Sequence, residues 1–475
     1  MHTQKDFDSL TPAERRFVEP IAKKRKEKPW HQLDTFTTDD APALEGGRLV
    51  RVRLYDPCPK ALDLRGLDAL VDVSTIGEVG LEGITLGKHP RLAVLRFDDN
   101  AVKALDVSGC PALRTLDVRN NKLSSLKGLP KGLVVLLCAE NPLKALDVSA
   151  LTSLEELSAY ECGLTRIDLR PLVRLRELLL QDNAGLDVDC SSLAALTSLF
   201  VTENGARVTL PKKAPALAEL GVSGNPLEKL DASVYPALDH LRAARCGLRT
   251  LRIDNPVLDL LDVENNALET IDLGKAPRLS TLKLAGNPLS RIDLSPLRRL
   301  ANVTLPEGAE VVATELQKNT VPELRARFGL PKGSAQLAKM GPYELHRFAD
   351  GYNWDDGEKK LFDVVRHPSC DRATALLVYW LSEPGEHTEY PKPTDAPKDA
   401  RKMVELLREI EKKMAAGGFK SELIPFDLRD VGGTDLTDDD KRIPAVMRKP
   451  VKPKSGGTVI ARPVTPKAAP KKKRA

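Results

Sequence analysis

Two isolated cysteines and one histidine–cysteine pair are the residues in this chain whose types could do chemistry. Cys162 stands in "LSAYECGLTRIDL" and Cys246 in "LRAARCGLRTLRI", each between a charged residue and a glycine. A cysteine thiolate acts as a nucleophile or a metal ligand when its site is accessible and electropositive. His367 and Cys370 have the H-x-x-C spacing of a ligand pair, and Asp355 precedes them. Whether any of these residues forms a site depends on the elements that hold them.

The segments around both isolated cysteines belong to a repeat. The phrase Leu-x-Leu/Val-x-x-Asn-x-Leu recurs every 20 or 21 residues over about 210 residues, and such a fixed period predicts a solenoid. We call the Asn slot of this phrase the ladder position. It is occupied in turn by Asn100, Asn121, Asn141, Cys162, Asn183, Asn204, Asn225, Cys246, Asn266 and Asn287, with Gly308 at the degenerate far end.

The chemistry of the ladder position explains the cysteines. Alternating apolar residues before it, such as Leu95 and Phe97, predict a short strand with one buried face. A buried Asn both donates and accepts hydrogen bonds, so a column of Asn side chains can satisfy the backbone of adjacent turns. Cysteine is small, tolerates burial and has a weak S–H donor. We therefore expect Cys162 and Cys246 to be ladder residues, and because they stand four repeats apart they cannot share a zinc ion.

The phrase resembles the leucine-rich repeat, L-x-x-L-x-L-x-x-N/C-x-L, over residues 48–310. It is most similar to short bacterial versions, whose second half has the form seen in "ALDVSGCPAL". The resemblance implies an α/β solenoid with a parallel sheet on its concave face, and a role in binding a protein partner. The terminal repeats are irregular, with Pro57 at one ladder position. Before them, Thr11, Pro12 and Glu14 predict a helix start, which either caps the solenoid or forms a loose arm.

In seven repeats an aspartate stands six residues after the ladder position, and together these residues form a column of carboxylates. A calcium site or a catalytic row would need these groups to converge, whereas Asp at a fixed phase favours hydrogen bonds to the turn backbone. Lys127 and Arg252 occupy the same phase, which supports a structural role. The members of this column are Asp106, Asp147, Asp168, Asp189, Asp231, Asp272 and Asp293.

The residues six, four and two places before the ladder position should line the concave face. Several are apolar where polar residues are expected, and charged residues surround them, which is typical of a protein-binding surface. Cover by the C-terminal domain, or sequence drift, would also explain the apolar residues. The candidate partner-binding residues are Leu137, Tyr160, Leu179, Phe200, Arg96, Arg119, Arg242, Asp262 and Glu264; Val135, Asp98, Asp117, His240 and Lys283 share the face.

The periodicity changes near residue 311, and three helices are predicted before residue 390. The phrases "NWDDG", "HPSCD" and "TALLVYW" resemble a small bacterial helical domain family of uncharacterised function. We expect Asp355 or Asp356 to begin the second helix and Asp371 the third. The alternative function is an enzyme or effector with its active site around Asp355, His367 and Cys370, targeted by the repeats. Some bacterial leucine-rich-repeat effectors carry a cysteine ubiquitin ligase with a Cys-x-Asp motif, which this sequence does not match.

The sequence predicts five parts. They are an N-terminal helix and arm (1–47), the solenoid (48–310), the small helical domain (311–390), a linker with a long helix (391–440) and a disordered basic tail (441–475). The tail holds twelve Lys or Arg and no Asp or Glu. The net charge of the whole chain is +5, but the net charge of residues 1–440 is −7. The tail could contact nucleic acid or acidic surfaces nonspecifically.

Composition excludes several classes of protein. No apolar run approaches the about 20 residues of a membrane span. Seven scattered cysteines and a start without a secretory pattern predict a cytoplasmic protein. No metal-ligand set is complete and no cofactor motif is present, so we expect no metal and no cofactor. The sequence therefore predicts a non-enzymatic protein–protein interaction module.

Overall fold

A computed structural model describes residues 2–37, 43–330, 336–426, 428, 442–452 and 458–461. The chain forms two compact units. The first unit comprises Met1–Leu258 with Asp262–Ala267, and the second comprises Asp259–Leu261 with Leu268–Ala475. No helix among the described residues is long and apolar enough to cross a membrane.

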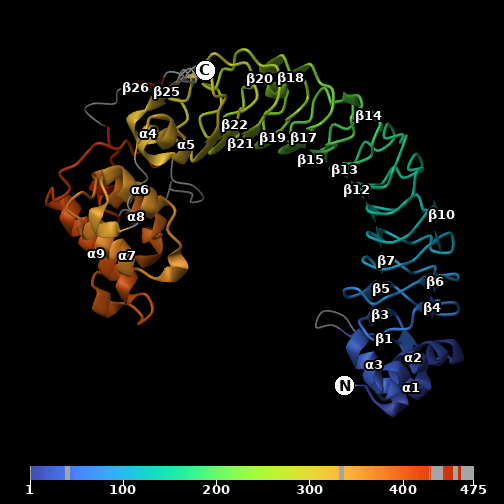
Figure 1. The fold of residues 1–475 in the computed structure, drawn as a ribbon. Coiled ribbons are helices and arrows are strands. Elements are labelled where there is room, and N and C mark those ends of the chain that lie inside the picture. The colour runs from blue at the N-terminus through green and yellow to red at the C-terminus, as the bar shows by residue number, and fades with distance from the viewer. Residues whose placement is uncertain are drawn as a thin grey trace, which may run out of the picture. The chain divides into compact units, whose positions relative to one another are not determined.

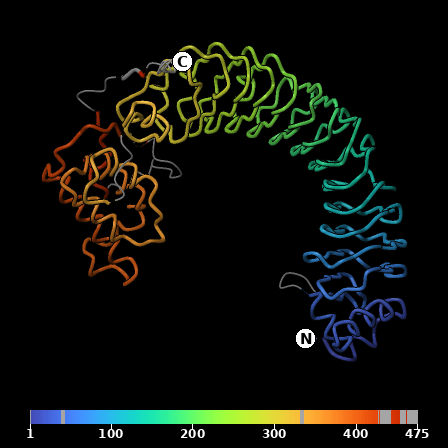
Figure 2. The backbone as a smooth tube through the Cα atoms, viewed as in Figure 1, coloured from blue at the N-terminus to red at the C-terminus, as the bar shows by residue number. Residues whose placement is uncertain are grey.

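The first unit is a solenoid whose repeats stack in chain order (Figure 1). Each repeat contributes one short strand, and the strands pair in parallel with equivalent positions in register. Figure 2 shows the chain winding as a coil from one repeat into the next. The strands of this sheet are β3 (Arg51–Leu54), β5 (Asp72–Thr75), β7 (Val94–Arg96), β9 (Thr115–Asp117), β11 (Val135–Leu137), β12 (Glu156–Ser158), β13 (Glu177–Leu179), β15 (Ser198–Phe200), β17 (Glu219–Gly221) and β19 (His240–Arg242).

Strands of two or three residues lie on the opposite side of several coils, where they pair two by two in parallel. Between the two sides lies a core made mainly of leucine, because the central residue of every sheet strand points inward; Leu136, Leu157 and Leu178 are fully buried. The outer strands are β4 (Ala61–Asp63), β6 (Gly83–Thr85), β8 (Leu105–Asp106), β10 (Leu126–Lys127), β14 (Val188–Asp189), β16 (Val208–Thr209), β18 (Lys229–Asp231) and β20 (Thr250–Arg252).

Three helices cap the first repeat: α1 (Gln4–Ser9), α2 (Pro12–Arg25) and α3 (Pro29–Phe36). As predicted, Thr11 and Glu14 form a capping box at the start of α2. Glu14 is fully buried, and its other carboxylate oxygen accepts the backbone N–H of Leu49 at 2.9 Å, in the small hairpin of β1 (Leu44–Glu45) and β2 (Arg48–Leu49). The helix therefore seals the open end of the core and is not a loose arm.

The second unit begins with the last repeats. There β22 (Thr281–Lys283) pairs with β24 (Asn302–Thr304), and β23 (Arg291–Asp293) pairs with β25 (Glu310–Thr314). The helices α4 (Glu315–Thr320) and α5 (Pro322–Arg327) follow. The buried Gln317 donates its amide N–H groups to the carbonyls of Leu294 and Leu297 at 2.6 and 2.7 Å, so α4 closes this end of the repeats.

The helical part of the second unit has its own core. The expected three helices are present as α6 (Pro342–Asp350), α7 (Lys359–Arg366) and α8 (Arg372–Leu381), with α9 (Arg401–Ala415) beside them (Figure 1). Leu406, Leu407 and Ile410 of α9 are buried in the same core as α8. The predicted boundary at residue 390 therefore separates α9 from the helices against which it packs.

The basic segment after residue 440 also departs from prediction. Ile443, Met447 and Val451 are buried in the helical core, and the indole N–H of Trp380 donates to the Met447 carbonyl at 2.9 Å. Further on, β26 (Thr458–Ala461) pairs antiparallel with β25. The prediction of a disordered tail from residue 441 is thus wrong for 442–452 and 458–461. The rest of that segment lies outside the described residues.

Candidate partner-binding face

The ladder side chains fix the backbone that carries the sheet. The amide of Asn141 accepts the N–H of Leu123 at 2.9 Å and donates to the carbonyl of Val118 at 2.8 Å, both in the preceding repeat. The same two bonds recur at Asn121, Asn183, Asn225 and Asn266. Asn204 differs, because its amide nitrogen has no partner among the described residues. Since every turn is tied to its neighbour, the residues before each ladder position have fixed directions.

The two ladder cysteines replace only the hydrogen bond that the asparagine amide donates to a carbonyl of the preceding repeat. The thiol of Cys162 donates to the Cys138 carbonyl at 3.2 Å, and that of Cys246 donates to the Val222 carbonyl at 3.3 Å. A thiol does not replace the accepting amide oxygen of asparagine here. The backbone carbonyl of Cys246 accepts the N–H of Leu227 instead, at 2.8 Å. Burial raises the pKa of Cys246 to about 11. Both thiols are buried and donate to backbone carbonyls, which favours a structural role over a nucleophilic one.

The carboxylate column also binds backbone. In each of the seven predicted residues one carboxylate oxygen accepts the N–H two residues further on, at 2.9–3.2 Å. Arg170 adds two side-chain bonds to Asp168 and lowers the pKa of that carboxyl to about 2. The residues lie on the outer strands or in the adjoining turns, so they do not converge on a common centre.

On the other side, which we call the sheet face, the outward residues of the strands form columns. Leu179 and Phe200 occupy paired positions in neighbouring strands, whereas Leu137 lies two strands from Leu179 with the buried Ser158 between them. All three apolar side chains are half-buried. The ring of Phe200 extends over Gly221, where an added Cβ would lie 2.4 Å from a ring carbon. An apolar surface thus runs along one column of the sheet.

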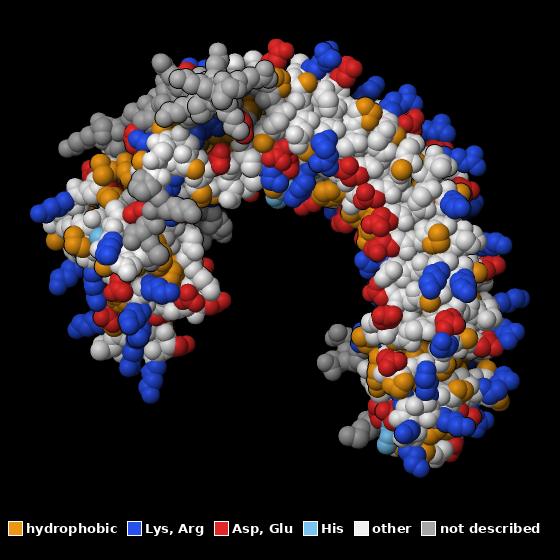
Figure 3. Space-filling model, in the orientation of Figure 1, with side chains coloured by type: hydrophobic (Ala, Val, Ile, Leu, Met, Phe, Trp, Pro, Cys, Tyr) orange, Lys and Arg blue, Asp and Glu red, His pale blue; other side chains and the backbone are white. Residues whose placement is uncertain are grey.

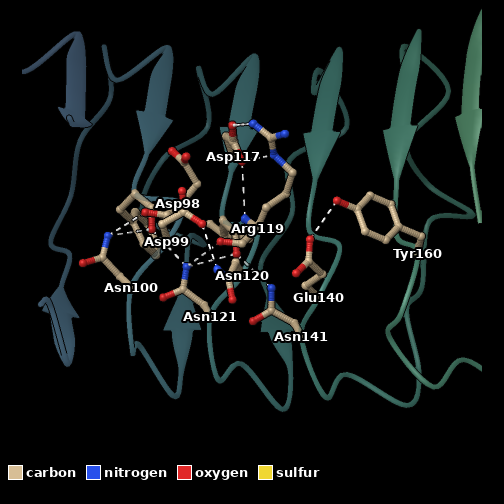
Figure 4. Close-up of polar contacts among 12 residues, drawn as sticks. Asp98, Asp99, Asn100, Asp117, Arg119, Asn120, Asn121, Glu140, Asn141 and Tyr160 are labelled. Atoms are coloured by element: carbon tan, nitrogen blue, oxygen red, sulfur yellow. Dashed lines mark hydrogen bonds and ion pairs between the residues drawn. The ribbon is translucent and has the colours of Figure 1, made fainter. Parts of the chain in front are cut away.

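A polar network borders this surface toward the N-terminus (Figure 4). Arg119 makes a bidentate ion pair with the buried Asp117, with N–O distances of 2.9 and 2.7 Å. Burial, together with the charge of Asp117, raises the pKa of Asp98. The hydroxyl of Tyr160 donates to Glu140 at 2.8 Å, and burial raises the tyrosine pKa to about 12. Tyr160 therefore lies on the same face as the apolar column, next to a carboxylate.

The remaining predicted residues lie on the same sheet face. Arg96 pairs in register with Asp117, and Arg242 pairs in register with Gly221 at the end of the apolar column. Asp262, at the end of β21 (Leu260–Asp262), and Glu264 belong to the next repeat, where their carbonyls accept N–H groups of residues 243 and 245. The sheet thus brings the apolar and charged candidates onto one continuous surface.

Sequence reasoning missed one column of this face. The residue just before the ladder position has positive φ in eight repeats, with values of 48–58°, and its side chain is exposed at the edge of the sheet. Non-glycine residues rarely adopt this conformation, although Asn and Asp do so more readily than others. The signal in the sequence is the acidic or amide residue repeated at this position. The column consists of Asp99, Asn120, Glu140, Glu161, Asp182, Glu203, Arg245 and Asn265.

The candidate residues of the helical domain have structural roles instead. Cys370 is buried, and burial raises its pKa to about 12. His367 accepts the backbone N–H of Ser369 at 3.0 Å in the turn after α7. The buried Asp371 caps α8 as predicted. The residue before α7 is Glu358, whereas Asp355 and Asp356, the predicted starts, are exposed in a preceding 3-10 turn. Among the described residues no group of three or more His, Cys, Asp or Glu could hold a metal ion.

Comparisons with known proteins agree with this architecture. Residues 341–415 match a family described as a domain of unknown function (DUF4274), which includes α9. No curated protein matches the sequence. Among solved structures, the chain is similar to the functional domain of InlJ from Listeria monocytogenes, with 22% identity, a TM-score of 0.44, and coverage of 56% of this chain and 66% of that one.

The chain is also similar to two further solved structures. The leucine-rich effector protein YopM from Yersinia pestis is 21% identical, with a TM-score of 0.40 and coverage of 65% of this chain and 92% of that one. The plant peptide hormone receptor RGFR1, solved in complex with RGF2, is 18% identical, with a TM-score of 0.39 and coverage of 55% and 51%. The fold of the repeats is that of a leucine-rich-repeat solenoid, as the sequence predicted.

Proposed function

We propose that this protein is a non-enzymatic interaction module whose leucine-rich repeats bind a protein partner on the sheet face of the first unit. Solenoids offer extended surfaces of this kind, since each repeat adds outward side chains at fixed spacing. The observation that carries the proposal is the apolar column of Leu137, Leu179 and Phe200, half-buried but open to solvent on a sheet whose other face is fully packed.

The surroundings of that column support the proposal. Apolar anchors encircled by charged and polar groups are typical of the energetic centre of protein interfaces. Here Tyr160 adds an aromatic ring that is held in place by Glu140, and Arg119 is held by Asp117. Side chains that are already fixed lose little conformational entropy when a partner binds. The face is therefore preorganised for contact.

Affinity capture from a lysate of the source organism tests this function. Wild-type protein is compared with a Leu179→Glu, Phe200→Glu variant, which places two charges where an apolar contact is expected. Loss of such anchors costs on the order of 2 kcal/mol or more, so the partner should be retained about thirtyfold less.

The matched control is a Val173→Glu, Val257→Glu variant, because these valines are exposed apolar residues outside the outward strand positions. The proposal predicts that the control captures the partner as well as wild type does. Circular dichroism establishes that all three proteins are folded. Equal loss in both variants, or equal capture by all three, would contradict binding on the sheet face.

A further inference from the structure

The charge of the sheet face specifies the chemistry of its partner. Seven successive repeats, from that of Asn100 to that of Asn225, carry four columns on this face: the positions six, four, two and one before the ladder position. These columns contain ten acidic residues and only two basic ones, Arg96 and Arg119. The acidic residues are Asp98, Asp99, Asp117, Glu140, Glu156, Glu161, Glu177, Asp182, Glu203 and Glu219.

Little of this charge is compensated within the protein. The structure pairs Asp117 with Arg119 and Glu203 with Arg245, and gives the other eight carboxylates no ion pair among the described residues. In the space-filling view, acidic side chains gather along the inner side of the first unit and basic ones along its outer side (Figure 3). Like charges held close together repel one another and destabilise a fold, and a bound cationic partner relieves that repulsion.

The carboxylates lie next to the apolar column and not at random. Glu156 and Glu177 are paired in register, and each lies two residues before Ser158 or Leu179 on its own strand. Burial, together with the charge of Glu177, raises the pKa of Glu156. At the sheet edge, Glu161 and Asp182 occupy successive turns in the left-handed conformation that fixes the direction of their side chains. Between these two rows lies Gln181, whose buried amide oxygen has no donor among the described residues.

We propose that the partner presents a lysine- or arginine-rich segment with a large apolar side chain, which docks across β12, β13 and β15. This inference rests on the proposed function and names the class of partner. The apolar side chain contacts Leu179 and Phe200, while the cations lie over Glu156 and Glu177 on one flank and over Glu161 and Asp182 on the other. Complementary charge of this kind accelerates association and selects among partners.

The protein's own basic terminus fits less well. Residues 462–475 have the sequence "RPVTPKAAPKKKRA". This segment supplies cations but no leucine, phenylalanine or other large apolar side chain that could cover the apolar column. A separate protein that combines both features satisfies the whole face. The proposal therefore commits to a separate partner, and the terminus is tested as a competitor.

The test uses fluorescence anisotropy with a short fluorescein-labelled peptide of lysine and arginine around a central Leu-Phe pair. Matched peptides replace either the cations by glutamate or the Leu-Phe pair by Gly-Ser. The full-length protein should bind the first peptide most tightly, and added salt should weaken that binding because it screens exposed charges. A Glu156→Gln, Glu177→Gln variant should bind it about fivefold more weakly.

The control variant is Glu228→Gln, Glu269→Gln, which removes two exposed charges that lie outside the four columns; it should bind as wild type does. Equal weakening in both variants, or equal binding of the acidic peptide, would overturn the inference. So would tighter peptide binding by a full-length variant in which Lys471, Lys472 and Lys473 are glutamine, because the terminus would then occupy the face.

The two proposals fail in different ways. A captured partner that depends on Leu179 and Phe200 but is unaffected by Glu156→Gln, Glu177→Gln would overturn the basic-partner inference and leave the proposed function standing. Capture that is insensitive to both pairs of substitutions would contradict both.

Discussion

At the scale of single residues, cysteine and asparagine are interchangeable in the ladder because both donate a hydrogen bond to the preceding repeat. Burial shields a thiol from reagents in solution, both where it raises the pKa, as at Cys246, and where a hydrogen bond with Cys138 lowers the pKa, as at Cys162. We expect all seven cysteines, each of them buried, to resist a thiol reagent such as dithionitrobenzoate in the native protein and to react together on unfolding. One thiol that reacts rapidly in the native state would contradict the structural role of that cysteine.

Gly221 is the residue that gives Phe200 its place on the sheet face. A Gly221→Ala substitution puts a Cβ against the ring, so the ring must move away from the apolar column. We expect partner capture to fall while the free energy of unfolding drops by only about 1 kcal/mol, since a side-chain end can shift. A Gly83→Ala variant is the control, because Gly83 lies on the outer strand β6 and a Cβ added there meets no atom within 4 Å. Unchanged capture by Gly221→Ala would show that the position of the ring is unimportant.

At the scale of elements, α2 stabilises the whole first unit through one carboxylate. Glu14 joins the start of the helix to the first hairpin, and its removal leaves buried N–H groups unpaired. Glu14→Ala should lower the free energy of unfolding by about 3 kcal/mol. Glu19→Ala, an exposed position on the same helix, should have almost no effect. Chemical denaturation monitored by circular dichroism measures both, and equal midpoints would refute the capping role.

The helical domain carries a partly buried titratable group, His346, in α6. Burial lowers the pKa of His346 from 6.5 to about 4, and its ring contacts the Thr374 hydroxyl at 3.1 Å. Because the unfolded chain binds a proton at higher pH than the folded chain, stability should fall as the pH drops from 6.5 toward 4, by on the order of 2 kcal/mol. A His346→Gln variant should lose part of this pH dependence in thermal melts, whereas His367→Gln should keep it.

Element boundaries show where sequence reasoning succeeded and where it failed. The 21-residue period predicted the solenoid, since a repeat must place equivalent residues in equivalent positions. Ile443, Met447 and Val451 follow a spacing of four residues, but the surrounding lysines and prolines concealed it. The partners of those residues are far away in the sequence, at α8 and α9, so local composition gave no sign of their burial.

At the scale of the whole molecule, charge is separated along the chain. The body is acidic, much of that charge lies on the sheet face, and the C-terminal segment is basic. The candidate face followed from counting positions before the ladder, which assigned Leu179 and Phe200 to the same surface. Counting every second residue did not identify the exposed carboxylates just before the ladder position. These residues lie in a turn with positive φ, where the alternation of the strand ends.

Acidification should weaken the binding of a basic partner. The pKa of Glu156 lies above the usual 4.5 and that of Asp98 above 3.8, so these groups lose their charge before ordinary carboxylates as the pH falls. Affinity for the lysine-rich peptide should therefore decline at a higher pH than the titration of an ordinary glutamate predicts, and the decline should shift to lower pH in Glu156→Gln. A pH-independent affinity would exclude these carboxylates from the contact.

The most direct test of binding on the sheet face is site-specific photocrosslinking. A benzophenone amino acid is placed at the position of Phe200, or of Val173 as control, in protein produced in the source organism. Irradiation should yield one discrete crosslinked product at Phe200 and none at Val173. The same product from both positions, or a product from Val173 alone, would contradict partner binding on the sheet face.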